Sequence, residues 1–247
     1  RIFDVAFQGV SDPWYHALSM ATTSSGAEEE YHWLGAISGM KELLGEITIS
    51  NLIQHGWTIR NREWENTISI KRKDIERDRL GVYTPLVSSM AEAARMHPGE
   101  LVAELLSNGF TTKDYTGKNF FDTDKKAHAK ALKFTNKGTA ALADGSYEAA
   151  RANLQGRLNA EGRAMRLGAK LLLVVPPALE AAARKILVAD QIDGSTNVNK
   201  GTATPLVVAE LAAYSDTAWY LIEAGKAIKP IIVQTEAPPK PAMVTND

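Results

Sequence analysis

Residues 57–72, WTIRNREWENTISIKR, carry the clearest structural pattern in this chain of 247 residues. Apolar side chains recur at every second position from Trp57 to Ile59 and again from Trp64 to Ile70, except that Asn66 occupies one position of the second series. A period of two is typical of β-strands, whose successive side chains point to opposite faces of a sheet. The pattern therefore predicts two strands that lie close together in the sequence.

We interpret these strands as a β-hairpin over residues 56–72 that turns near Asn61 and Arg62. Charges of both signs alternate along it, and such a run normally marks a solvated surface. A two-stranded hairpin is barely stable alone, however, and this one carries two tryptophans. We therefore expect it to pack on another subunit through ion pairs and aromatic anchors. The candidate contact residues are Trp57, Arg60, Arg62, Glu63, Trp64 and Glu65.

The segment that precedes the hairpin does not begin like a compact domain. Phe3, Phe7 and Trp14 are dispersed among polar residues, and residues 22–26 form a polar stretch of Thr, Ser and Gly. Such a segment buries little of its own apolar surface. Two interpretations stay open: a strap across the subunit's own core, or an arm that clamps an adjacent subunit through these three aromatic residues.

A long helix is predicted after the hairpin, over residues 82–108. Its apolar residues recur at four-residue spacing, beginning with Leu86 and Met90. Because proline disrupts a helix interior, Pro98 is expected to begin a second helix after a break at residues 97–99. Gly109 is expected to follow the helix end.

The second half of the chain predicts a mixed sheet with flanking helices. Residues 111–139 are polar and irregular, and Ser146 is a candidate N-cap of the next helix. The expected strands are residues 170–175, 205–208, 219–222 and 228–234, with a helix opening at Pro176 and Pro177 and running through Val188. Residues 191–201 are expected to form a loop, and the proline-containing tail to be extended. The fold class is α+β.

Composition excludes several classes of protein. The chain has no cysteine, which removes disulfides and thiolate chemistry, and its formal net charge of −1 gives no overall attraction to nucleic acid or membranes. No nucleotide-binding, hydrolase or metalloprotease motif occurs. We expect no catalytic residue, no metal site and no cofactor. Asp122 and Asp124 are expected to serve a turn, and the lysines of residues 125–137 to form a solvated surface. We also expect no signal peptide.

Short pieces of sequence occur along the chain in a distinctive order. They are Thr23-Ser24-Ser25, Tyr31-His32-Trp33-Leu34-Gly35, Glu65-Asn66-Thr67-Ile68, Arg72-Lys73-Asp74-Ile75-Glu76, Leu80-Gly81, His97-Pro98, Asn119-Phe120-Phe121-Asp122-Thr123-Asp124, Val174-Val175-Pro176-Pro177, Trp219-Tyr220-Leu221 and Ile228-Lys229-Pro230-Ile231. Each piece is ordinary, but in order and spacing the chain resembles the family of major head subunits of Mu-like phages and prophages, often called gpT. Where the family has Asp-Gly before Asn119 and His after Asp124, this chain has Tyr115-Thr116-Gly117 and Lys125.

The resemblance implies the HK97-type capsid fold, with an N-terminal arm, an extended hairpin called the E-loop, a long spine helix in a peripheral domain, and a mixed-sheet axial domain. The implied boundaries are an arm and leading segment at 1–45, the E-loop at 46–80, the spine helix and peripheral domain at 81–140, the axial domain with strands returning to the peripheral domain at 141–235, and a tail at 236–247.

The implied function is that of a major capsid protein, not an enzyme, which self-assembles as hexamers and pentamers into an icosahedral shell around double-stranded DNA. Implied partners are other copies of the chain, portal and scaffold proteins during assembly, a decoration protein, and the packaged DNA on the inner face, without a membrane. The expected location is the virion, after assembly in the bacterial host cytoplasm. Two alternatives stay open: an encapsulin-like or other shell of the same fold, and an unrelated α+β hydrolase.

Overall fold

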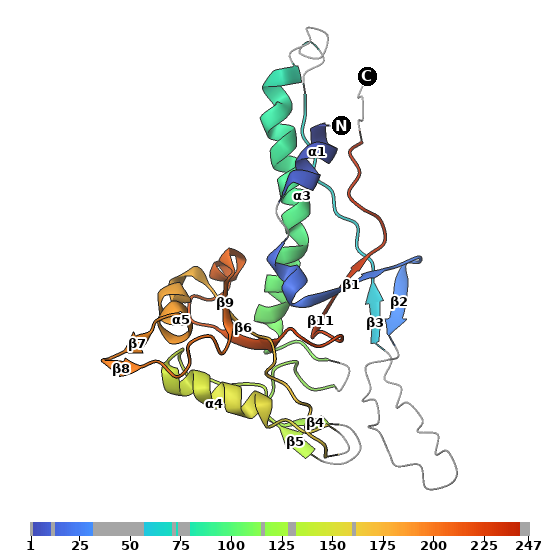
Figure 1. Cartoon of the computed structure of the whole chain (residues 1–247). Helices are drawn as coiled ribbons and strands as arrows, with labels where there is room; N and C mark the ends of the chain where they lie inside the picture. Colours follow the sequence, from blue (N-terminus) through green and yellow to red (C-terminus); the bar gives the residue numbers. More distant parts are fainter. Residues whose placement is uncertain are drawn as a thin grey trace, which may run out of the picture.

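The computed structural model describes residues 2–10, 13–31, 57–70, 73, 80–114, 117–127, 132–159 and 162–242. A long helix, α3, forms the axis of the subunit, and a lobe of sheet and short helices (residues 141–224) sits at its C-terminal end. The N-terminal helix lies beside the middle of α3, and two pairs of strands lie on the side of its C-terminal part that faces away from the lobe (Figure 1). Among the described residues no helix is both long and apolar enough to cross a membrane.

Helix α3 runs without interruption from Leu80 to Asn108 and contains both Pro85 and Pro98. The expected break at residues 97–99 is therefore wrong. The reason lies in the packing around Gly99, because a Cβ there would lie 3.1 Å from Trp14 Nε1 and 3.4 Å from Tyr15. The 3₁₀ helix η1 (Trp14–Ala17) thus presses on α3 next to the proline, and tertiary contacts offset the lost backbone hydrogen bond. The helix ends just before Gly109, as predicted.

The lobe is organised around β6 (Leu171–Val175), whose residues are all buried. Strand β6 lies between β10 (Tyr220–Glu223), to which it is antiparallel, and β9 (Thr204–Val207), to which it is parallel. A fully apolar run suits a strand that is covered on both faces. The predicted strands at 170–175, 205–208 and 219–222 are confirmed within one or two residues.

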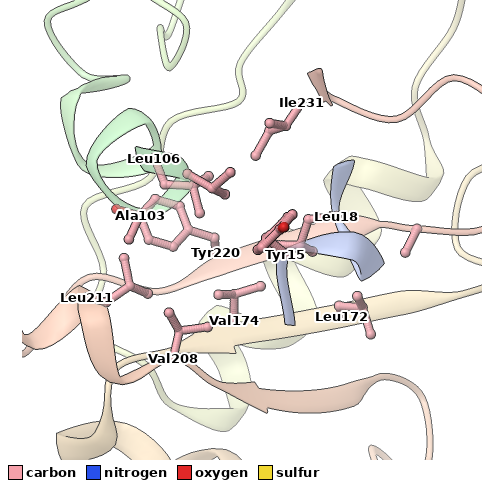
Figure 2. Close-up of a cluster of buried hydrophobic side chains, with 12 residues drawn as sticks. Tyr15, Leu18, Ala103, Leu106, Leu172, Val174, Val208, Leu211, Tyr220 and Ile231 are labelled. Carbon is pink, nitrogen blue, oxygen red and sulfur yellow. The ribbon is translucent and has the colours of Figure 1, made fainter. Parts of the chain in front are cut away.

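One face of this sheet packs against the C-terminal turns of α3 and against η1. Figure 2 shows this cluster, in which Tyr220 and Val174 of the sheet meet Ala103 and Leu106 of α3. Leu18, which follows η1, is fully buried in the same cluster. The N-terminal segment therefore contributes to the subunit's own core.

Two helices cover the other face of the sheet. They are α4 (Asp144–Gln155) and α5 (Glu180–Leu187), the latter preceded by the 3₁₀ helix η2 (Pro177–Leu179). Helix α4 begins at Asp144, so Ser146 is in its first turn and not at the cap as expected; its hydroxyl accepts the N–H of Ala143 at 2.9 Å. A hydroxyl in the first turn can satisfy a free N–H as well as one at the cap.

Buried Asn197 closes the C-terminal end of α5. Its Nδ2 donates to the carbonyls of Ile186 and Ala189 at 2.9 and 2.8 Å, and its Oδ1 accepts the N–H of Asn199 at 2.9 Å. These contacts satisfy helix carbonyls that have no partner inside the helix. They also shape the expected loop at 191–201, which contains the small strands β7 (Gln191–Ile192) and β8 (Ser195–Thr196).

The remaining strands lie outside the lobe. Strand β1 (Ser19–Thr23) pairs in parallel with β11 (Ile231–Thr235), and β4 (Lys125–Ala127) pairs with β5 (Leu132–Phe134) in the segment expected to be irregular. Helix α1 (Ile2–Gly9) packs along α3. The 3₁₀ helix η3 (Ala209–Ala213) contacts α3 from the lobe.

The predicted hairpin over residues 56–72 is wrong. Strand β3 (Trp57–Arg60) pairs with β2 (Glu28–Tyr31) in antiparallel register, and residues 61–70 contain no strand. The segment that joins this pair is residues 32–56, which lie outside the described residues, as does much of the expected E-loop at 46–80. A period of two is also compatible with an extended chain that forms no ladder: here residues 62–67 are all exposed, and only Ile68 and Ile70 at the end of the pattern are half-buried.

A buried carboxylate, Glu223, closes the end of β10. Its oxygens accept N–H groups of Gly168, Ala169, Lys170 and Gly225, three of them at 2.7–3.2 Å. Burial raises the pKa of Glu223, but the four backbone bonds outweigh it, so that pKa lies below its ordinary value. Glycine is required at 225, because a Cβ there would lie 2.8 Å from Glu223 Oε1.

Replacing Glu223 by Gln is expected to lower the free energy of unfolding by about 2 kcal/mol, because charge-assisted hydrogen bonds are lost and an NH₂ group faces backbone donors. A lowered folded-state pKa gives stability that is present above the unfolded pKa of about 4.3 and is lost as pH falls through the folded value. Urea unfolding followed from neutral to acid pH should show this loss in the wild type and a weaker one in E223Q. Equal pH profiles would contradict the assignment.

Candidate assembly surface

Asn61 ties the segment after β3 to the loop before β2. Its backbone N–H donates to Ala27 O at 2.9 Å, and its Nδ2 lies 2.6 Å from Gly26 O and 3.0 Å from Ser24 Oγ. Sequence analysis assigned Asn61 to a hairpin turn. In the structure Asn61 is not in a turn but directly follows β3, and it hydrogen-bonds the loop before β2. An asparagine donates and accepts at once, which suits a position enclosed by a loop on one side and a strand on the other.

The same network continues into β11. Gln234 Nε2 donates to Asn61 Oδ1 at 2.7 Å, and Gln234 Oε1 accepts the hydroxyl of buried Tyr31 at 2.7 Å. Tyr31 also bonds Thr22 on β1 at 2.8 Å. Side chains from β1, β2 and β11 thus meet Asn61, and we call this set (Thr22, Tyr31, Asn61, Gln234) the clasp. The clasp joins two strand pairs whose members lie far apart in the sequence.

The loop between β1 and β2 is fixed by its own hydrogen bonds. Glu29 Oε1 accepts the N–H of Ser25 at 3.0 Å and the hydroxyl of Ser24 at 3.1 Å. These bonds lower the pKa of Glu29 below its ordinary value, the backbone bond contributing most. The clasp therefore rests on a loop that is itself held in one conformation.

Trp64 lies exposed on the side of α3. Its ring packs edge-on against His97 with centroids 4.5 Å apart, and the Arg62 guanidinium lies 5.5 Å from the Trp64 centroid. His97 Nδ1 is 3.2 Å from Glu100 Oε2. Because 55% of the Trp64 residue stays accessible, this stack presents an aromatic surface to the outside.

The other candidates from residues 57–65 do not join this stack. Trp57 is 39% exposed at the start of β3, opposite Tyr31. Arg60 forms an exposed ion pair with Glu28 at 3.0 Å. Glu63 and Glu65 are exposed beside Trp64 in sequence. The structure thus brings together Arg62 and Trp64 and leaves Trp57 and Arg60 on the strand pair.

The N-terminal candidates divide into two groups. Phe3 and Phe7 stack on each other at 5.9 Å on α1, and the Arg95 guanidinium lies 5.2 Å from the Phe7 ring. Trp14 packs on the core, and its Nε1 donates to Glu210 Oε1 at 3.0 Å. For residues 13–31 the strap interpretation therefore describes the structure.

Exposed apolar residues that the sequence did not reveal lie on α1 and on the N-terminal half of α3. Val82 is 75% exposed and Leu86 45% exposed on α3, and Ile2 and Val5 are exposed on α1. Helical periodicity placed Leu86 on the buried face. Periodicity shows which residues share a face of a helix but not how much of the helix is covered, so no signal in the sequence identifies this exposure.

The carboxylates of Asp122 and Asp190 have structural roles. Asp122 Oδ1 accepts the N–H of Asp124 at 2.9 Å, which confirms the turn. In the loop after α5, Asp190 pairs with Lys200, whose hydrogen bond and charge lower the pKa of Asp190. Within the described ranges no three His, Asp or Glu side chains are grouped so as to hold a metal ion.

Comparison with known families gives a match along most of the chain. A family model described as "Mu-like prophage major head subunit gpT" matches residues 1–141 and 131–211. The Mu-like prophage FluMu major head subunit of Haemophilus influenzae is 28% identical over 232 residues, which cover 94% of this chain and 54% of that protein. The major capsid protein of Escherichia phage Mu is 40% identical over 110 residues, covering 44% of this chain and 36% of that protein. The chain thus spans about half or less of the length of these curated relatives.

Solved structures give the same fold. A chain of the bacteriophage JBD30 procapsid superposes with a TM-score of 0.72 at 24% identity, covering 85% of this chain and 96% of that one. A chain of the JBD30 capsid decorated with minor capsid protein trimers gives 0.63 at 24% identity, covering 82% and 92%. The fold is therefore HK97-like and α+β, as predicted.

The clasp makes a testable prediction. Asn61→Ala is expected to lower the free energy of unfolding by about 2 kcal/mol, because half-buried Gln234 and buried Ser24 lose hydrogen bonds to Asn61. Amide hydrogen exchange should rise selectively in residues 57–70 and in β11, while the core of the lobe keeps its protection. N66A, an exposed asparagine of the same segment, is the matched control; equal exchange in both variants would contradict the role of the clasp.

Proposed function

The chain belongs to the family of Mu-like prophage major head subunits, and we propose that it is the major capsid protein of a Mu-like phage, which self-assembles into an icosahedral shell around double-stranded DNA. The observation that carries the proposal is the family match over residues 1–141 and 131–211, on a chain with the fold of phage capsid and procapsid subunits. The virion is then its location. Its work is structural, and we assign it no catalytic activity.

The contacts between subunits would then form at the surfaces that the fold of a single subunit leaves exposed. The lobe, within the axial domain proposed for residues 141–235, would pack beside its equivalents around the axis of a hexamer or pentamer. The α3 side, within the peripheral domain proposed for residues 81–140, presents Val82 and Leu86 to neighbours, and Trp64 from the segment proposed as the E-loop (46–80) adds its exposed ring there. Exposed apolar surface of this kind is typical of interfaces. Each contact is weak, but many contacts per subunit add through multivalency.

We extend the proposal to residue roles. Trp57 and Trp64 serve as aromatic anchors on an adjacent subunit, and Arg60, Arg62, Glu63 and Glu65 supply charges that set register across the seam. Phe3 and Phe7 lie on α1, where Ile2 and Val5 offer an outward apolar surface. Portal, scaffold and decoration proteins are further proposed partners.

The assembly role of the Trp64 stack is tested by the variant Trp64→Ala, Arg60→Glu, Arg62→Glu. We expect a folded subunit with unchanged far-UV circular dichroism that forms no closed shells, because the aromatic anchor and both cations of the seam are removed. The matched control, Trp64→Phe with Arg60→Lys and Arg62→Lys, keeps ring and charge and should assemble. Negative-stain electron microscopy and sedimentation measure whether each variant forms closed shells. Normal shells from the first variant would exclude this surface from the interface.

A further inference from the structure

Residues 62–70 have the sequence pattern of a β-strand but lie in no sheet. Their second half, with Thr67, Ile68 and Ile70, contains the β-branched residues that favour strands. The whole segment is described, and none of its residues belongs to a ladder. Residues 62–67 are also exposed to solvent. The segment therefore carries the backbone donors and acceptors of a strand without a ladder partner.

Contacts at its start hold this segment along the side of the subunit. Asn61 donates its N–H to Ala27 O at 2.9 Å, just before the segment begins. Within the segment, the Trp64 ring packs against His97 of α3 with 4.5 Å between ring centroids. Neither contact uses the main chain of residues 62–70. Because the segment is already placed, its pairing with another strand costs less conformational entropy than the ordering of a free loop.

The subunit also contains a strand edge that can accept another strand. Strand β1 pairs with β11 on one side, and the described part of the chain contains no second partner strand for β1. An open hollow borders β1 and is lined by its residues 21–23 and by residues 29–31 of β2. A two-stranded sheet is marginally stable alone, and an outer edge presents unpaired N–H and C=O groups. Each copy of the chain thus has both a strand without a sheet and a sheet with a free edge.

Charge and connectivity indicate a second copy of this chain as the partner. The register of β1 contains residues 231–235 and none of residues 62–70, so the two features do not pair within one subunit. Residues 60–65 carry two arginines and two glutamates, which leaves no net charge to attract a polyanion or a strongly charged protein. A copy of the chain, with a formal net charge of −1, suits such a segment. Contact between two different surfaces of identical subunits generates rings when the rotation between them closes.

We propose that residues 62–70 of one subunit pair as a β-strand with the outer edge of β1 in an adjacent copy. The proposal rests on the capsid function proposed above and adds main-chain pairing as the mode of contact. In strand addition the main-chain hydrogen bonds supply affinity, and side chains at alternate positions supply specificity. The rings and charges that we assigned to the seam would then fix the register of this ladder.

Amide hydrogen exchange of the full chain, compared between unassembled subunits and shells of the same protein, tests this pairing. Exchange at residues 62–70 should be fast in the subunit and about tenfold or more slower in the shell, because ladder hydrogen bonds protect amides. Residues 19–23 of β1 should gain protection in the same comparison. Strand β6, which already pairs on both edges, is the internal reference. Fast exchange at residues 62–70 in intact shells would overturn the proposal, as would protection there without any gain in β1.

Two proline variants separate main-chain pairing from simple burial of the segment. Successive N–H groups of a strand point to opposite edges, so only one of two neighbouring amides can donate to the adjacent strand. Asn66→Pro and Thr67→Pro each remove one amide at an exposed, uncharged position. One variant should need about tenfold or more higher subunit concentration to form shells, because a carbonyl in the interface is left unpaired, and the other should assemble like the wild type.

Sedimentation over a series of subunit concentrations measures this difference. Asn66→Ala and Thr67→Ala keep both amides and should assemble like the wild type. Equal behaviour of the two proline variants, whether both assemble normally or both fail, would overturn the proposal. Wild-type shells whose residues 62–70 exchange as in the free subunit reject strand addition alone. Absence of shells from the wild type rejects the capsid function, and this proposal with it.

Discussion

The subunit depends on the apolar junction at which the last turns of α3 pack on the sheet of the lobe. Tyr220 is central to it, with Phe121 5.6 Å and Phe110 6.4 Å away between ring centroids. Phe121 reaches this position because Gly109 has no side chain, since a Cβ there would lie 2.8 Å from its ring. Each large apolar side chain buried here contributes about 1.5–3 kcal/mol, and no other described cluster joins α3 to the lobe.

Beyond the junction, a second kind of interaction holds the structure together. The lobe is closed by apolar packing on both faces of β6, whereas the strands beside α3 are joined by the polar clasp of Tyr31, Asn61 and Gln234. Polar ties fix geometry without covering much apolar surface, so the side of α3 keeps Val82 and Trp64 exposed. A subunit whose lobe is well packed and whose long helix α3 leaves apolar residues exposed is suited to form part of a larger assembly.

The sequence predicted those elements whose pattern is local. The apolar run at residues 171–175 and the prolines after it identify a strand and a helix without knowledge of their neighbours, and the strands at 204–207 and 220–223 follow the same logic. Elements decided by distant partners were missed. Pro98 lies inside α3, where η1 packs beside it, and β3 pairs with the distant strand β2, next to which Asn61 is held by the loop at residues 24–27. The spacing of apolar residues in the sequence cannot reveal either the packing of η1 on α3 or the pairing of β3 with β2.

The candidate surface was predicted in part, for the same reason. Trp64 and Arg62 do form one exposed stack, but their partner His97 lies on α3, at a position where the sequence predicted a break in the helix. The exposure of residues on α1 and α3 depends on packing between elements. The family resemblance supplied the architecture that these local patterns could not.

Negative-stain electron microscopy of the purified wild-type chain, with its mass distribution measured by sedimentation, tests the central claim most directly. The account predicts closed polyhedral particles of megadalton mass. A monodisperse monomer or small oligomer that forms no shell, even with its phage assembly partners present, would contradict it.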